Sequence, residues 1–339
     1  MRGEREFIRL IEHRARRSSP DVVVGIGDDA ALIVPKAETC LVIASDVIVE
    51  DVHFRRRYFP PQALGHKALA VNLSDIAAMG ATPRYFLLTL GLPADCEDWF
   101  ADQILAGILA LADQHNVVLI GGDTSHAPER IFIDITILGE VTRSEAVQRS
   151  GAQVGDLIYV SGELGDSAAG LAVLQNQAST GSLHNTQISI QAAIRSHLQP
   201  QPRLKLGRIL AHRHLATAMM DISDGLSIDL ARLCEKSSVG ARLQADTIPI
   251  SSAAQVISSR NRQSPLQLAL HGGEDYELLF TVSPQNQAAV TQLQTVLAET
   301  GDSVPLTCIG QIQPAQDGLQ IETLTGIHPL EIKGYDHFR

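Results

Sequence analysis

Residues 65–80 read GHKALAVNLSDIAAMG, a run dominated by small apolar side chains. This composition predicts a helix that can pack closely against a β-sheet. Lys67 and Asp75 are eight residues apart, a spacing that places them on one face of the predicted helix. Asp75 stands in the helix interior, where aspartate is a poor helix former unless another group engages it. The stretch therefore predicts a packed helix that carries a functional carboxylate.

Strands and further helices are predicted on both sides of this helix from apolar periodicity and turn residues. In the first half of the chain we expect helices at 1–17 and 97–114 and strands at 22–26, 40–45, 85–91, 117–121 and 131–141. In the second half we expect a strand at 156–162, a helix from Ser167, helices at 203–213 and 225–236, and exposed loops at 175–190 and 251–265. The polar segment TRSEAVQRSGAQVGD separates the halves, so we expect domains at 1–145 and 146–339.

Apolar stretches of the chain run into aspartate at five places. These places contain seven aspartates: Asp28, Asp29, Asp46, Asp75, Asp123, Asp221 and Asp224. A strand that stops at a carboxylate puts a hard oxygen ligand at a sheet edge, and oxygen ligands without nearby His or Cys suit Mg²⁺. One such aspartate is usually a turn residue or a helix cap. Seven in similar settings favour one pocket that holds several metal ions.

The segment GIGDDA at 25–30 matches the GxGxxA pattern of dinucleotide-binding folds. Such a fold needs a helix directly after the glycines, but the chain leaves only about seven residues before Pro35 and the next strand. Asp28 and Asp29 would also stand where a pyrophosphate must meet bare backbone amides. We therefore favour metal ligation by these two aspartates, with a tight turn capped by an aspartate as the structural alternative.

Further motifs each have a functional and a purely structural interpretation. GGDT at 121–124 places glycines beside a carboxylate, which lets backbone amides approach a phosphate. DISDG at 221–225 is either a metal site or a helix N-cap. GGEDYE at 272–277 is either part of a site or a solvated turn, and His53 alone would more often be a packed or surface histidine than a ligand contact.

The bulk composition narrows the function classes. The 339 residues include 45% apolar and 19% charged residues, an ordinary globular balance that allows two domains. A net charge of −11 argues against nucleic acid or an anionic membrane as the main partner, so phosphate substrates would need cations in the site. No apolar run approaches the about 20 residues that cross a bilayer. The scattered cysteines predict free thiols in a reducing compartment and a cytoplasmic protein: Cys40, Cys96, Cys234 and Cys308.

The motifs of several large enzyme classes are missing from the sequence. The chain has no GxxxxGK[ST], so it is not a Walker-type NTPase, and no HRD or DFG set of protein kinases. It also has no HExxH or GxSxG, and no Ser-His-Asp set stands out.

Taken in order along the chain, the motifs resemble those of the thiamine-monophosphate kinases, a family of the aminoimidazole ribonucleotide synthetase-like superfamily. The resemblance covers essentially the whole chain and rests on GIGDDAA, SDVIVEDVHF, KALAVNLSDIAAMGA, GGDT, RSGAQVGD, VSGELGDSAAG, DISDGL, GGEDYELLF and GYDHF. It implies an α/β plus α+β two-domain fold, with an N-terminal mixed-sheet domain that dimerises and a C-terminal α+β domain. It also implies a homodimer that transfers the ATP γ-phosphoryl group to thiamine monophosphate.

The resemblance also implies a role for individual residues. Mg²⁺ ligands would be Asp29, Ser45, Asp46, Asp75, Asp123, Asp221 and Asp224, of which Asp75, Asp46 and Asp29 are expected to be catalytic. Asp28 would support the site without binding the metal directly. ATP would contact Gly122, Asp123, Arg149 and Ser223, and thiamine monophosphate would contact His53, Glu274 and Tyr335. The family commonly has a hydroxyl residue where Ala44 stands, and often an aromatic residue near the adenine where Leu105 stands, so these two contacts are expected to differ.

The expected mechanism is direct in-line transfer without a phosphoenzyme, because the acceptor phosphate is largely deprotonated at neutral pH and needs no strong base. Two alternatives are another ATP-dependent enzyme of the superfamily and a non-catalytic Mg-nucleotide binding module. Selenophosphate synthetases carry a reactive Cys or Sec in the N-terminal segment and the hydrogenase-maturation dehydratase carries a C-terminal Cys. Residues 1–20 contain no Cys and the chain ends in DHFR.

Overall fold

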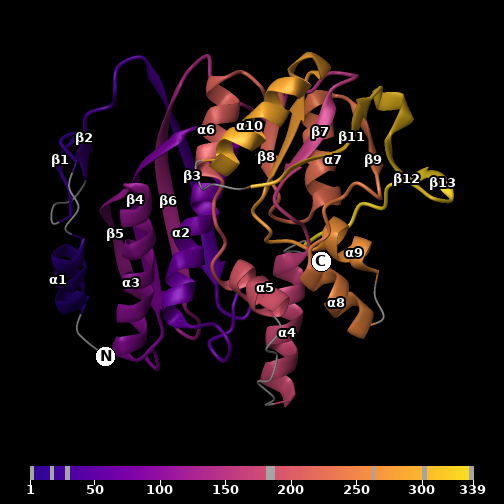
Figure 1. Ribbon diagram of the computed structural model, residues 1–339. Helices are drawn as coiled ribbons and strands as arrows, with labels where there is room; N and C mark the ends of the chain where they lie inside the picture. The colour runs from indigo at the N-terminus through magenta and orange to yellow at the C-terminus, as the bar shows by residue number, and fades with distance from the viewer. Residues whose placement is uncertain are drawn as a thin grey trace. The chain divides into compact units, whose positions relative to one another are not determined.

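The computed structural model describes residues 4–15, 19–26, 31–180, 188–261, 264–299 and 304–335. The chain divides into two compact units (Figure 1). Unit 1 comprises Met1–Ile76, Ala81–Ser144 and Leu198–Pro200, and unit 2 comprises Ala77–Gly80, Glu145–His197 and Gln201–Arg339. The domain limits 1–145 and 146–339 remain a prediction.

Unit 1 is built on a four-stranded sheet with the order β3-β6-β4-β5. Its strands are β3 (Thr39–Val49), β4 (Thr82–Leu92), β5 (Val118–His126) and β6 (Phe132–Thr142). Strand β6 is antiparallel to both β3 and β4, whereas β4 and β5 run parallel. The sheet is therefore mixed, as expected for the N-terminal half.

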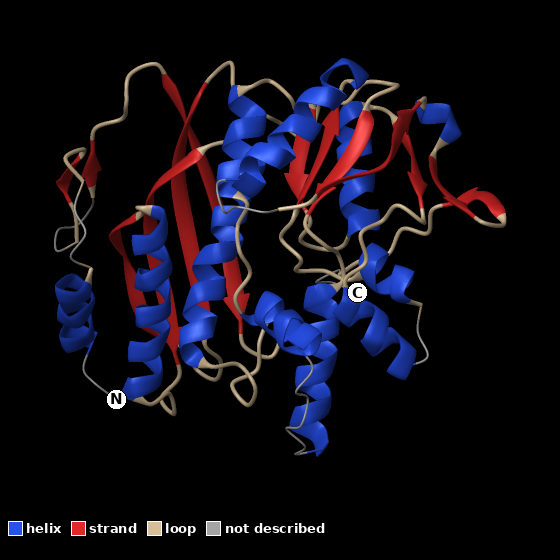
Figure 2. Cartoon of the chain, viewed as in Figure 1, coloured by secondary structure: helices blue, strands red, loops and turns tan. Residues whose placement is uncertain are grey.

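Two helices, α2 (Pro61–Ala78) and α3 (Asp98–His115), pack together beside this sheet (Figure 2). Glycines allow the close contact between them: a Cβ at Gly65 would lie 1.9 Å from the Ile104 carbonyl oxygen, and one at Gly107 would lie 2.0 Å from that of Gln62. Alternate residues of β6 are fully buried, which marks the face that packs against apolar side chains: Ile133, Ile135 and Ile137.

The opposite face of the unit 1 sheet is only partly covered. The short strands β1 (Val22–Val24) and β2 (Leu32–Ile33) pair with each other and contribute to an apolar cluster around Tyr85 and Val118. Helix α1 (Glu4–Arg14) completes the unit. Along β3, three large apolar side chains remain 42%, 63% and 46% exposed: Leu41, Ile43 and Val47.

Unit 2 contains a seven-stranded sheet with the order β13-β12-β9-β11-β7-β10-β8. Its strands are β7 (Leu157–Ser161), β8 (Ala218–Asp221), β9 (Gly240–Gln244), β10 (Leu278–Val282), β11 (Leu306–Gln313), β12 (Leu319–Thr323) and β13 (Gly326–Pro329). All neighbouring pairs are antiparallel except β9 and β12. This arrangement with flanking helices is an α+β domain.

Helices accompany the unit 2 sheet in two apolar clusters. Their bounds are α4 (Asp166–Thr180), α5 (Ile188–Leu198), α6 (Leu204–His212), α7 (Leu226–Ser237), α8 (Ser252–Asn261), α9 (Pro265–His271) and α10 (Gln287–Glu299), with short 3₁₀ helices η1 (Pro284–Asn286) and η2 (Ala315–Asp317). The main core joins the sheet to α7 and α9. A second cluster joins α4, α5 and α8.

Several predicted elements differ from the structure. The predicted loop at 251–265 is wrong, because residues 252–261 form α8 and bury Ala253, Ala254 and Ile257 at helical spacing. The predicted loop at 175–190 is wrong at both ends, because α4 continues to Thr180 and α5 begins at Ile188; residues 181–187 lie outside the described ranges. The predicted helix at 65–80 is confirmed as α2.

All four cysteines are free thiols. Cys96 and Cys234 are buried, and burial raises the pKa of Cys96 to about 11 and that of Cys234 to about 12, so both thiols are protonated at neutral pH. Cys40 and Cys308 are only half-buried. Among the described helices none is long and apolar enough to cross a membrane.

Candidate functional site

Asp46 and Asp75 lie on neighbouring elements of unit 1, strand β3 and helix α2. The backbone N–H of Asp46 donates to Asn72 Oδ1 at 3.1 Å, and Asn72 in turn donates to the Ala68 carbonyl oxygen at 3.0 Å. Asn72 is fully buried, so it fixes α2 against the strand. Asp75 follows Asn72 by three residues and therefore lies on the same side of the helix. Asp46 pairs with Ile135, whose side chain is buried, which directs the Asp46 side chain to the same face of the sheet.

Asp123 lies on the other face of the sheet from Asp46. Asp123 pairs with Thr89 of β4, and Thr89 pairs with Asp134 of β6. Asp46 pairs with Ile135, the residue next to Asp134, so it belongs to the adjacent row of paired residues across the sheet. Adjacent rows point to opposite faces because side chains alternate along a strand. The expectation that strands stop at these aspartates is wrong for Asp46 and Asp123, since β3 continues past Asp46 to Val49 and β5 continues past Asp123 to His126.

Gly122 occupies a position that excludes any side chain. Its φ is 148°, and a Cβ there would lie 1.9 Å from the carbonyl oxygen of Leu88 on β4. Gly122 is itself exposed, so its backbone is open to a ligand. The proposed approach of a phosphate to this backbone thus has a steric basis, although the residue lies within β5, which extends beyond the predicted strand at 117–121.

Ser45 lies within β3 and not at its end, and its hydroxyl group contacts oxygen atoms of β6. Its Oγ lies 3.2 Å from Asp134 Oδ1, 3.3 Å from the Ile135 carbonyl oxygen and 3.0 Å from Thr136 Oγ1. Its neighbour Ala44 has no hydroxyl, so the departure expected there stands. The Ser45 hydroxyl is therefore within hydrogen-bond distance of the carboxylate of Asp134, a residue that sequence reasoning missed.

His53 has a defined ring orientation in the segment between β3 and α2. The backbone N–H of Val49 donates to His53 Nδ1 at 3.0 Å, and the His53 N–H donates to the Val49 carbonyl oxygen at 2.9 Å. Because Nδ1 accepts this bond, the ring proton of the neutral imidazole lies on Nε2. A neutral His53 can therefore donate from Nε2 to an anionic group.

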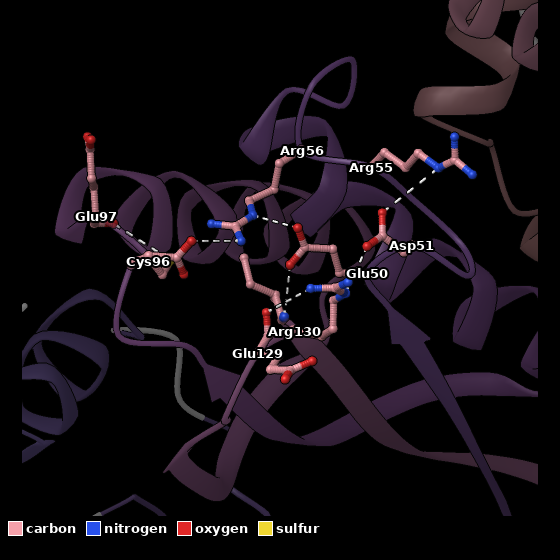
Figure 3. A network of polar contacts seen from close by, with 10 residues as sticks. Glu50, Asp51, Arg55, Arg56, Cys96, Glu97, Glu129 and Arg130 are labelled. Atoms are coloured by element: carbon pink, nitrogen blue, oxygen red, sulfur yellow. Dashed lines mark hydrogen bonds and ion pairs between the residues drawn. The ribbon is translucent and has the colours of Figure 1, made fainter.

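Ion pairs hold the segment that carries His53 (Figure 3). Arg56 Nε donates to Glu50 Oε1 at 2.6 Å, and Glu50 Oε2 accepts from the Ile131 N–H at 3.0 Å. Glu50 is only 7% exposed, and its hydrogen bond raises the pKa of Arg56 against the opposing effect of burial. Arg130 pairs with Asp51 at 2.8 Å, which ties the start of β6 to the same segment.

In unit 2, the loop 221–225 between β8 and α7 is shaped by one buried carboxylate. Asp229 Oδ2 accepts the backbone N–H groups of Ser223, Asp224 and Gly225 at 3.0, 3.0 and 3.1 Å. Arg232 Nη1 lies 2.7 Å from Asp229 Oδ1 and 2.5 Å from Asp224 Oδ2. Burial raises the pKa of Asp229 to about 6, although its hydrogen bonds to the loop and Arg232 favour the ionised form.

The loop 272–277 lies beside the loop 221–225. The N–H of Glu274 donates to the Ser223 carbonyl oxygen at 2.7 Å, and the N–H of Tyr276 donates to that of Ile222 at 2.9 Å. Glu274 and Tyr276 both have positive φ, 67° and 51°, a conformation that non-glycine residues seldom adopt. Such strain is typical of ligand sites, which favours a functional loop over the solvated turn.

Two acids of the same loop hold it in place. Asp275 accepts the N–H groups of Gly165 and Ser167 at 2.8 and 3.1 Å, at the start of α4. Glu277 is buried and accepts two hydrogen bonds from Arg203, one of them from Nε at 2.6 Å. Removal from water raises the pKa of Asp275 to about 8. These contacts leave Glu274 as the acid of the motif with a quarter of its side chain exposed.

Tyr335 and Arg149 take different places in unit 2. The N–H of Tyr335 donates to the Asp224 carbonyl oxygen at 3.2 Å, so the C-terminal segment joins the two loops. Arg149 instead lies at the far end of α7, where its carbonyl oxygen accepts from Ser237 Oγ at 3.1 Å. The helix spans about 17 Å between these ends. Unit 2 therefore brings Ser223, Asp224, Glu274 and Tyr335 together, and does not bring Arg149 to them.

The donor chemistry suits Mg²⁺, because the predicted ligands are carboxylate and hydroxyl oxygens. The described part of the chain contains no group of three or more His, Cys, Asp or Glu that could hold a metal ion. Asp28 and Asp29 lie outside the described ranges. The pocket for several metal ions therefore stays a prediction.

Leu105 is fully buried on α3, which gives it a packing role.

Comparisons with known proteins agree with the two-domain organisation. The family models of the AIR synthase related protein match at residues 27–141 for the N-terminal domain and 153–317 for the C-terminal domain. The chain is similar to the thiamine-monophosphate kinase of Salmonella typhimurium, with 41% identity over 337 residues that cover 99% of this chain and 98% of the relative.

Solved structures show the same similarity. The crystal structure of thiamine-monophosphate kinase from Stenotrophomonas maltophilia K279a has a TM-score of 0.81 and 38% identity, covering 94% of this chain and 95% of that chain. A structure described as AaThiL complexed with AMPPCP and TMP has a TM-score of 0.78 and 32% identity, covering 100% and 99%. These similarities confirm the predicted α/β plus α+β two-domain fold.

Proposed function

Because the chain belongs to the AIR synthase related family and, within it, to the thiamine-monophosphate kinases, we propose that it phosphorylates thiamine monophosphate with ATP. An oxygen of the acceptor phosphate attacks the γ-phosphorus of ATP. The bond from that phosphorus to the β,γ-bridging oxygen breaks, and its electron pair leaves with ADP. The products are thiamine diphosphate and ADP.

One observation from the structure supports this function most directly: the loops 221–225 and 272–277 and the segment at Tyr335 form one hydrogen-bonded group. This group carries residues proposed to bind metal, ATP and thiamine monophosphate. A relative with 32% identity is described in complex with AMPPCP and TMP, an ATP analogue and the acceptor of the proposed reaction.

The proposed residue roles are those that the family resemblance implies. In unit 1, Asp29, Ser45, Asp46, Asp75 and Asp123 are proposed to hold Mg²⁺, and in unit 2, Asp221 and Asp224. Ser45 and Asp123 lie on the face of the unit 1 sheet opposite to that of Asp46. When bound, Mg²⁺ would screen the repulsion between two polyanions and orient their oxygens. Ser223 and the Gly122 backbone would contact ATP. Arg149 would reach ATP only at a part of the nucleotide distant from Ser223.

The acceptor phosphate needs no general base to remove a proton, so His53 is not proposed as one. The second ionisation of a phosphate monoester lies near pH 6, so the attacking oxygen is already unprotonated at neutral pH. His53 Nε2–H would instead donate to the acceptor and fix its orientation, since Nδ1 is engaged by Val49. Catalysis would then rest on positioning and electrostatics, without a phosphoenzyme.

The activity is tested by mass-spectrometric analysis of the products formed from ATP, Mg²⁺ and thiamine monophosphate. We expect thiamine diphosphate and ADP in equal amounts, with free thiamine as a control that yields no product. ATP consumption without dependence on thiamine monophosphate would instead favour another ATP-dependent enzyme of the superfamily. Binding of ATP without any turnover would favour the non-catalytic nucleotide-binding module.

We also propose that the protein is a cytoplasmic homodimer with the exposed face of β3 at the interface. The exposed side chains of Leu41, Ile43 and Val47 lie two and four residues apart on one strand, so they form an apolar stripe on one face of the unit 1 sheet that only Ser45 interrupts. A second copy of this chain would cover the stripe with the same surface. The four free thiols fit a reducing compartment.

Replacement of Ile43 by aspartate is expected to convert the dimer to a monomer. Ile43 is 63% exposed in the chain, and a charge at its position would be buried without a partner at the interface. Analytical ultracentrifugation measures the change in mass. Leu324→Asp is the matched control, because Leu324 is fully exposed in the turn between β12 and β13. A dimer that persists in Ile43→Asp would place the interface elsewhere.

A further inference from the structure

A buried histidine of unit 2 contacts the acid that is proposed to bind thiamine monophosphate. His197 lies near the end of α5 and is only 1% exposed. Its Nδ1 lies 3.3 Å from Glu274 Oε2 and 3.0 Å from the Oγ of Ser167 on α4. Ser167 is fully buried. The ring thus links the strained loop 272–277 to two helices.

From these contacts we infer that His197 is a positioning residue for Glu274, an inference that rests on the proposed function. A proton on Nδ1 can be donated both to the Ser167 hydroxyl and to the Glu274 carboxylate. The contact places Glu274 Oε2 at 3.3 Å from the ring nitrogen and so restricts the carboxylate. His197 is too buried to touch the substrate itself.

The charge of Glu274 defines which part of the substrate it would contact. A carboxylate repels the phosphate of thiamine monophosphate, so it suits the cationic thiazolium and the amino group of the pyrimidine. The main-chain bond from Glu274 to Ser223 sets the backbone, and His197 sets the side chain. His197 would therefore act on the affinity for thiamine monophosphate and not on that for ATP.

Steady-state kinetics of His197→Ala and His197→Asn test this role. The alanine variant is expected to raise the KM for thiamine monophosphate about tenfold, while kcat and the KM for ATP change less than twofold. Asparagine has an N–H donor near the place of Nδ1, so His197→Asn is expected to restore most of the affinity. His212→Ala is the matched control, because His212 Nδ1 also contacts a glutamate, Glu145 at 2.9 Å, but is exposed on α6.

A double-mutant cycle with Glu274→Ala separates positioning from a general effect on folding. If His197 acts through Glu274, the double variant has the same KM for thiamine monophosphate as Glu274→Ala alone. Independent, multiplying effects in the two variants would overturn the inference, as would an unchanged KM in folded His197→Ala. Wild-type protein that forms no thiamine diphosphate would overturn the proposed function, and the role of His197 with it.

Discussion

Replacement of Asp75 by asparagine is expected to lower kcat at least 100-fold at low millimolar Mg²⁺. Asp75 lies on the side of α2 that Asn72 fixes against β3, so it is on the face of the helix that is turned toward the strand of Asp46. Two adjacent carboxylates can share cations, and the side chain of asparagine keeps the shape but loses the charge. Steady-state rates at several Mg²⁺ concentrations measure the effect, which higher Mg²⁺ should relieve in part.

Asp113→Asn is the matched control for Asp75→Asn. Asp113 also lies on a helix of unit 1, near the end of α3, and is exposed. We expect its kcat to stay within twofold of the wild-type value. Unfolding measurements on both variants separate a loss of chemistry from a loss of fold. A kcat near the wild-type value in Asp75→Asn would refute a shared-ligand role for this residue.

The helix that carries Asp75 could be predicted because small apolar residues dominate its sequence and few polar residues interrupt them. Other elements carried weaker signals. Residues 252–261 contain six polar side chains of Ser, Gln, Arg and Asn and only four apolar ones, yet α8 forms because Ala253, Ala254 and Ile257 are buried against α4 and α5. Packing against other helices stabilises α8, and the sequence of a polar segment alone does not show that such packing occurs.

The positions of the aspartates could be predicted less well than their number. Asp46 and Asp123 look like strand ends because a carboxylate follows an apolar run, but both strands continue along the edge of a half-covered sheet. Their faces depend on register, which sequence alone leaves open. Likewise, the supporting contacts of Glu277 and His197 join segments far apart in the chain, so no local motif indicates them.

Replacement of Asp229 by alanine is expected to lower the free energy of unfolding by about 3 kcal/mol. The change removes the acceptor of three backbone N–H groups in the loop 221–225 and leaves them without that partner in a buried place. It also removes one carboxylate from Arg232. Denaturant unfolding at pH 7.5 measures the loss, and the proposed metal and ATP contacts of the loop should weaken with it.

Asp229→Asn separates the hydrogen bonds of this residue from its charge. The folded-state pKa of about 6 exceeds the ordinary value near 3.9, so the folded protein binds the proton more tightly than the unfolded chain. The part of the stability that comes from this raised pKa is thus fully present below about pH 4 and is lost as the pH rises through 6. Asparagine does not titrate and its Oδ1 can still accept the backbone N–H groups, but its amide N–H₂ cannot accept from Arg232. The stability of wild type relative to Asp229→Asn should therefore rise as the pH falls from 7.5 toward 4, and a wild-type advantage that grows with pH would contradict the raised pKa.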